Sequence, residues 1–348
     1  MQHETAASYA KVLEMAQQLN LSPAAYRRAI ELAGLTPDRA DWLLYIDRFL
    51  IAVGALLIVA GIAAFFAWNW ADLDHMVKFA LIEGGIVTAV FAAWRLGLNS
   101  VAGRICLFAA AFLTGTLLAV FGQVYQTGAD PYGLFLVWAV LILPWAIIGR
   151  QAGIWILLQL LLNLTVIMYY TQVLNPPDGW WQLAQLLGPL VWLGSTLMDS
   201  TLASYLFALN ALALVIWEVA AHRGVTWMQG TIFPRLIAIA ALGTVLIPTI
   251  IIIVAAGLEE KAGLSVISPV LLLAATGACL YYYRYRRHDL FILTCSLLGV
   301  IMVFTSFSIR HMLGGSGSLL MLAVLVIAQV AGAAWWLRQV ARRWEAET

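Results

Sequence analysis

The chain has 348 residues, of which 63% are hydrophobic and only 11% are charged. A typical soluble domain has about 25% charged and about 45–50% apolar residues, so a soluble protein of this composition could not cover its own core. We therefore expect lipid to solvate much of the surface. The net charge of +1 gives no general attraction for nucleic acid or anionic substrates.

Cysteine and histidine usage predicts neither a disulfide framework nor a metal site. The three cysteines lie in apolar segments without paired spacing, which is typical of small buried side chains. The five histidines are scattered along the chain, which argues against a local metal site. We expect no cofactor.

Residues 1–47 differ from the rest because they are polar, carry charges of both signs and contain helix-boundary residues. Ser22-Pro23 is an N-cap followed by proline at the first helical position, and Gly34 suits the C-cap. Three short helices are also typical of a DNA-binding helix-turn-helix. However, acidic residues offset the basic ones here, and a DNA-binding domain needs a basic face. We predict a cytosolic helical region for docking or packing.

The remaining chain is a series of apolar segments that match the thickness of a bilayer. The first, residues 49–70, has roughly 22 residues, or roughly 33 Å as a helix, and forms a predicted helical hairpin with residues 76–96. Further candidates are residues 104–122, 132–148, 152–170, 184–198, 204–219, 232–257, 267–283, 290–309 and 318–337. We predict an all-α transmembrane bundle of about ten spans over residues 48–340, followed by a short cytosolic tail at 341–348.

Lysine and arginine positions predict the orientation, since these residues are enriched in cytoplasmic connections. Arg48, Arg95 and Arg150 fall on one side if spans alternate, and the opposing connections contain neither residue type. We predict a cytoplasmic N-terminus in the inner membrane. The basic residues beyond residue 220 would then face outward if every segment spanned. The conflict disappears if Ala184–Met198, which is short and contains Pro189, is re-entrant or interfacial, and both termini are then cytoplasmic.

Two passages resemble a known family. They are residues 54–62 (GALLIVAGI) with AWNW at 67–70, and residues 121–132 (FGQVYQTGADPY) followed by LVWA at 136–139. They resemble the domain of unknown function (DUF) 2157 family of predicted bacterial membrane proteins. The resemblance implies a bacterial multi-spanning membrane protein with a short cytosolic N-terminal region, and it brings no activity or catalytic residue.

Glu83 is an acidic residue well inside a predicted span. A charged carboxylate there costs roughly 2.5–3.5 kcal/mol on insertion scales, so it normally faces protein or water. It is either a proton or cation site, or a structural glutamate that is neutralised by burial or paired with Arg104. We expect the side chain to point into the helix bundle, with Arg104, Gln159 or Asn163 as its partner.

Other polar and small residues in the spans have helical spacing. Gln159 and Asn163 share one face, four residues apart, and either line a hydrophilic path or, as is commoner for such amides, join helices. Small residues that let helix backbones approach closely form two stripes, Gly84-Thr88-Ala92 and Ala111-Gly115-Ala119. We therefore predict that the second and third spans pack tightly together.

No motif in the sequence predicts an enzyme, and a lipid-acting enzyme would need a polar interfacial pocket that the sequence does not locate. The first hypothesis is a scaffold or assembly protein of the inner membrane. It would contact the lipid bilayer, and a protein partner through residues 1–47 or the Gln123–Tyr132 loop. The alternative is a transporter or channel for a small solute or ion with Glu83 near the path. The oligomeric state stays open.

Overall fold

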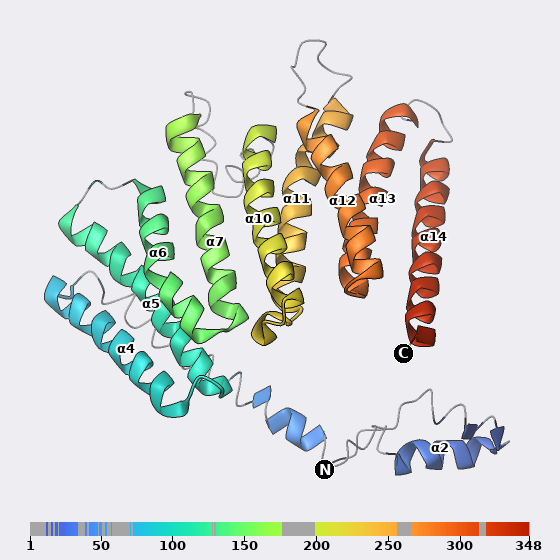
Figure 1. Cartoon of the computed structure of the whole chain (residues 1–348), viewed down its shortest axis with the longest axis horizontal. Coiled ribbons are helices and arrows are strands. Elements are labelled where there is room, and N and C mark those ends of the chain that lie inside the picture. Colours follow the sequence, from blue (N-terminus) through green and yellow to red (C-terminus); the bar gives the residue numbers. More distant parts are fainter. Residues whose placement is uncertain are drawn as a thin grey trace. The chain divides into compact units, whose positions relative to one another are not determined.

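The computed structural model describes residues 72–126, 130–175, 199–255, 266–312 and 318–347, together with 21–33, 42–47 and isolated other positions. The chain divides into two units, Met1–Asp74 and His75–Thr348, which are described separately. Every regular element among the described residues is a helix (Figure 1). The predicted all-α class is therefore confirmed.

The described part of the first unit contains the predicted short helix α2 (Pro23–Leu32). The Ser22 hydroxyl accepts a hydrogen bond from the Ala25 backbone N–H at 3.3 Å, and proline occupies the first turn. Both features favour a helix start here. An Arg28–Glu31 pair of 2.9 Å lies on its exposed surface. Residues 42–47 are helical as well.

The second unit is a series of long helices. In chain order these are α4 (His75–Leu96), α5 (Val101–Tyr125), α6 (Pro131–Gly149), α7 (Ala152–Tyr169) with the π-helical turn η1 (Tyr170–Leu174), α10 (Ser200–His222), the 3-10 turn η2 (Thr226–Met228), α11 (Ile232–Ala255), α12 (Ile267–Tyr285), α13 (Leu290–Met312) and α14 (Ser318–Glu347). Each α-helix corresponds to a predicted apolar segment. Several run further, and α14 continues through most of the predicted tail.

Eight helices in the described part of the chain are long and apolar enough to cross a membrane. The helix α12 falls outside this set because four tyrosines and Arg284 occupy its last turns. The predicted segments 49–70 and Ala184–Met198 lie outside the described residues. The total of about ten spans therefore stays a prediction.

Consecutive helices of the second unit alternate in direction, as Figure 1 shows for α10 to α14. The C-termini of α4, α6, α10, α12 and α14 and the N-termini of α5, α7, α11 and α13 lie at one end, which we call the basic end. Side chains join the connections there. Gln151 donates to the Arg104 carbonyl at 3.1 Å, and the Trp344 indole donates to the Arg284 carbonyl at 3.2 Å.

The residues that flank segment 176–198 lie together at the opposite end. The Tyr170 hydroxyl donates to the Asp199 carboxylate at 2.9 Å. Asp199 also caps α10, accepting from the Thr201 backbone N–H at 2.7 Å. The chain therefore leaves α7 and enters α10 at the same end of the unit, so these two helices are antiparallel.

The predicted tight pairing of α4 and α5 is present, but other residues make it. Ile82 and Ala93 of α4 are buried, and a Cβ added at Gly85 would lie 3.2 Å from Leu113 of α5. A Cβ added at Gly84 would meet no described atom within 4 Å. The contacting face is therefore rotated by one residue, about 100°, from the predicted stripe.

The small-residue stripe on α5 packs against α6 rather than α4. The Trp138 indole of α6 lies against Gly115, where an added Cβ would be 2.2 Å from a ring carbon. Its N–H donates to the Ala111 carbonyl at 2.9 Å. Gly115 therefore makes room for an aromatic ring, and the partly buried indole N–H has a hydrogen-bond acceptor.

Candidate functional site

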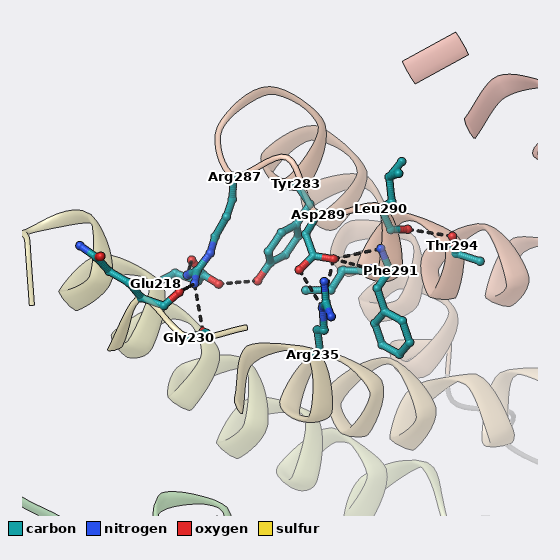
Figure 2. A network of polar contacts seen from close by, with 11 residues as sticks. Glu218, Gly230, Arg235, Tyr283, Arg287, Asp289, Leu290, Phe291 and Thr294 are labelled. Carbon is teal, nitrogen blue, oxygen red and sulfur yellow. Dashed lines mark hydrogen bonds and ion pairs between the residues drawn. The ribbon is translucent and has the colours of Figure 1, made fainter. Parts of the chain in front are cut away.

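A buried carboxylate lies in the last turns of α10. Glu218 is 6% exposed. Its Oε1 accepts a hydrogen bond from the Tyr283 hydroxyl at 2.8 Å, and its Oε2 accepts one from the Tyr282 hydroxyl at 3.2 Å. Figure 2 shows the Tyr283 side chain directed at this carboxylate. Both tyrosines come from the C-terminal part of α12, so the network joins α10 to α12.

Arg287 supplies the counter-ion. Its guanidinium forms an ion pair with the Glu218 carboxylate and is itself mostly buried. It also donates to the carbonyls of Gln229 and Gly230, at 2.9 and 3.1 Å. Because these carbonyls belong to the α10–α11 connection, one arginine links that connection to the α12–α13 connection. The buried charge is paired and hydrogen-bonded, as such charges require.

A second ion pair lies beside the first (Figure 2). The Arg235 Nε donates to Asp289 at 2.9 Å, and the Asp289 side chain is 4% exposed. Asp289 also accepts from the Phe291 backbone N–H at 2.9 Å, which caps the first turn of α13. The Arg235 guanidinium lies 5.2 Å from the centroid of the Phe291 ring. This pair therefore joins α11 to α13.

A cavity of about 540 Å³ lies next to Glu218, between α10 and α12. We call it the α10–α12 groove. Its lining is almost entirely apolar apart from Glu218, the two tyrosines, and His222 and Arg223 at its end. The lining residues are Leu214, Val215, Glu218, Val219, His222, Arg223, Ala278, Cys279, Tyr282 and Tyr283.

The buried charged groups at the basic end hold helices and connections together. The two buried acids each have a cation, and in the described part of the chain no group of His, Cys, Asp or Glu could hold a metal ion. Most arginines in the described part of the second unit lie at this end, and they are Arg95, Arg104, Arg150, Arg223, Arg235, Arg284, Arg286, Arg287, Arg338, Arg342 and Arg343. Lys78 and Arg310 lie at the opposite end. Charge is therefore strongly asymmetric between the ends.

The predicted amides meet in the middle of the unit, with Asn210 of α10 as a third member. Asn210 Oδ1 accepts from Gln159 at 3.0 Å and from Asn163 at 3.1 Å, and Asn210 Nδ2 donates to Asn163 Oδ1 at 2.7 Å. Asn210 is 0% exposed. The structure thus brings Gln159 and Asn163 together as a bridge between α7 and α10, which is the commoner role of such amides.

Glu83 and Arg104 do not meet, which corrects the predicted pairing. Glu83 lies 13 residues before the end of α4, about 20 Å from the connection to α5, whereas Arg104 lies in the first turn of α5 and its Nε donates to the Leu98 carbonyl at 3.1 Å. The Glu83 side chain is exposed and contacts none of the amides. The predicted hairpin partner of α4, residues 49–70, lies largely outside the described residues, so the direction of Glu83 relative to the complete bundle stays a prediction.

A second cavity, of about 770 Å³, lies where α5 ends and α6 begins, and we call it the α5–α6 groove. Gln126 and Gly128 in this connection have left-handed backbone conformations, with φ of 44° and 58°. The lining residues are Leu118, Ala119, Phe121, Gly122, Gln123, Gln126, Gly128, Pro131, Gly133, Leu134, Phe135 and Val137. The groove therefore includes half of the residues of the passage at 121–132 that carries the family resemblance.

Sequence reasoning missed Glu218 and Asp289, although each has a signal. Glu218 is a lone acid at the end of an apolar segment, and such a residue needs a cation from another segment. The basic run at 284–287, directly after another apolar segment, offers such a cation, and Arg287 supplies it. Asp289 immediately precedes an apolar segment, which is typical of an N-cap.

The helices, the apolar surface and the charge asymmetry together define a multi-spanning α-helical membrane protein. Residues 14–155 match the family model described as "Predicted membrane protein (DUF2157)", so the predicted resemblance is confirmed over this part of the chain. The match includes the α5–α6 groove and ends at the start of α7. Comparison with curated proteins and with solved structures gave no match.

Proposed function

We propose that this protein is a non-enzymatic assembly protein of the inner membrane, and that the α5–α6 groove receives an extended segment of a partner protein. The observation that carries the proposal is the lining of this groove. Its walls are apolar, and Gln123 and Gln126 are exposed at the loop without a hydrogen bond to another described side chain or backbone group. A primary amide both donates and accepts, which suits the alternating donors and acceptors of a peptide backbone.

The charge asymmetry between the two ends supports an orientation of the protein in the membrane. Arginine-rich connections favour the cytoplasmic side of a membrane, so the basic end is assigned to the cytoplasm and the α5–α6 groove to the opposite side. The entry of α10 at the end where α7 finishes also supports the predicted orientation of the later helices. A periplasm-active reporter inserted at Gly128 and a cytoplasm-active reporter inserted after Arg286 test the assignment, and the reverse pattern of activity would overturn it.

The alternative, a transporter with Glu83 near its path, has less support. Gln159, Asn163 and Asn210 are hydrogen-bonded to one another, so these amides form structural bonds between α7 and α10. Glu83 is exposed on a different helix. The interaction role therefore ranks first.

Photo-crosslinking in cells tests the partner directly. A crosslinking residue at Gln126 is expected to give a protein adduct of defined mass, and the same residue at Val140, an exposed apolar position of α6, is the control. The adduct should weaken when Leu134→Trp fills the groove in the same chain. No adduct at Gln126, or the same adducts at Val140, would contradict the proposal.

A further inference from the structure

The α10–α12 groove has an apolar wall that is open to its surroundings. Val215 and Val219 on α10 are 57% and 45% exposed, and Ala278 on α12 is exposed too. The volume of about 540 Å³ is in the range of pockets that hold small ligands, about 300–1,000 Å³. Since α10 is long and apolar enough to cross a membrane, this opening faces the hydrocarbon region of a bilayer.

The other end of the groove carries uncompensated positive charge. The Glu218 carboxylate is neutralised by Arg287 and accepts from both tyrosines. His222 and Arg223 also line the groove, and their side chains are exposed and form no hydrogen bond or ion pair with any described residue. The local charge available to a ligand is therefore positive.

The basic residues and the apolar wall of the groove lie at successive depths along α10. Arg223 follows the last residue of α10 at the basic end, whereas Leu214 lies nine residues earlier, about 13 Å deeper along the helix. A ligand in this groove must therefore be anionic at the membrane interface and apolar over the next turns of helix. Basic pockets between membrane helices on the cytoplasmic side favour anionic lipid headgroups for the same reason.

We propose that the α10–α12 groove binds an anionic phospholipid, with an acyl chain along Val215 and Val219 and the headgroup phosphate paired with Arg223 and His222. The Glu218–Arg287 network forms the floor of this site. Its hydrogen bonds hold α12 and the α10–α11 connection in place, which preforms the groove before the lipid enters. This site is separate from the α5–α6 groove and does not depend on the function proposed above.

Native mass spectrometry of the full chain in detergent tests the proposal with two lipids, phosphatidylglycerol and phosphatidylcholine of identical chains. Wild type is expected to retain phosphatidylglycerol preferentially. Arg223→Gln should lower its occupancy about fivefold, which corresponds to the loss of one basic residue near a lipid surface. Arg223→Lys should keep most of the binding. Arg342→Gln removes another exposed arginine of the basic end and is the matched control.

A second variant separates the two halves of the site. Val219→Trp fills the apolar wall and leaves Arg223 and His222 in place, so it should abolish the retained lipid while the protein still elutes as a folded species. Equal retention of both lipids by wild type would show apolar filling only and would overturn the proposal. Arg223→Gln behaving like Arg342→Gln would do the same. A copurifying protein seated in the groove in place of lipid would also refute it.

Discussion

Arg287→Met is the sharpest test of the network at the basic end. The change removes the cation of the Glu218 pair and the two hydrogen bonds to the Gln229 and Gly230 carbonyls. The Glu218 side chain is 8% exposed, so water cannot replace the lost partner. Removing one member of a buried pair costs about 3–5 kcal/mol, a large part of a total stability of about 5–15 kcal/mol.

Thermal unfolding in detergent, followed by loss of the monodisperse elution peak, measures this cost. Arg286→Met is the control, because the neighbouring Arg286 side chain is exposed and forms no hydrogen bond or ion pair with a described residue. The Glu218→Leu/Arg287→Met double variant removes both charges and should recover part of the loss. Equal melting midpoints for Arg287→Met and Arg286→Met would refute the reasoning, because the Glu218–Arg287 pair would then contribute no more than a surface charge.

Three further outcomes are expected. Gly115→Ala should lower the free energy of unfolding by about 1–3 kcal/mol, because a Cβ there would displace the Trp138 indole. The control Gly277→Ala should change the stability little, because no described atom lies within 4 Å of its added Cβ. Equal melting temperatures of the two variants would contradict this prediction. Asn210→Leu should cost about 1–2 kcal/mol by removing the amide bridge, and an unchanged midpoint would refute that role. Glu83→Gln should express and assemble like wild type, whereas loss of a pH-dependent flux in vesicles would favour the transporter alternative.

The helices of the second unit could be predicted from sequence, because a run of apolar residues as long as a bilayer is thick has few other structures open to it. Boundaries were less accurate where polar residues continue a helix, as in α14. The amide pair on α7 was also predictable, since Gln159 and Asn163 are fixed on one face by their spacing alone.

The contacts between helices could not be predicted in the same way. The partner of Gln159 and Asn163 lies 47 to 51 residues further along the chain, and its register depends on how two whole helices pack. The prediction that the Gly84 stripe contacts α5 was wrong for a related reason. Gly85 is as small as Gly84, so residue size alone does not determine which of the two faces α5. The Glu83–Arg104 pairing required a favourable register between antiparallel helices, and the structure places the two residues at different depths.

The amide bridge between α7 and α10 also constrains the order of events during synthesis. Gln159 and Asn210 are separated by 51 residues, which a ribosome adds in about 3–10 s at about 5–20 residues per second. During that interval α7 is complete while its amides lack their final partner. Asn163 donates to the Gln159 carbonyl at 2.7 Å within the same helix, and this bond does not require α10. The later arrival of Asn210 then completes the bonding and fixes α7 against α10.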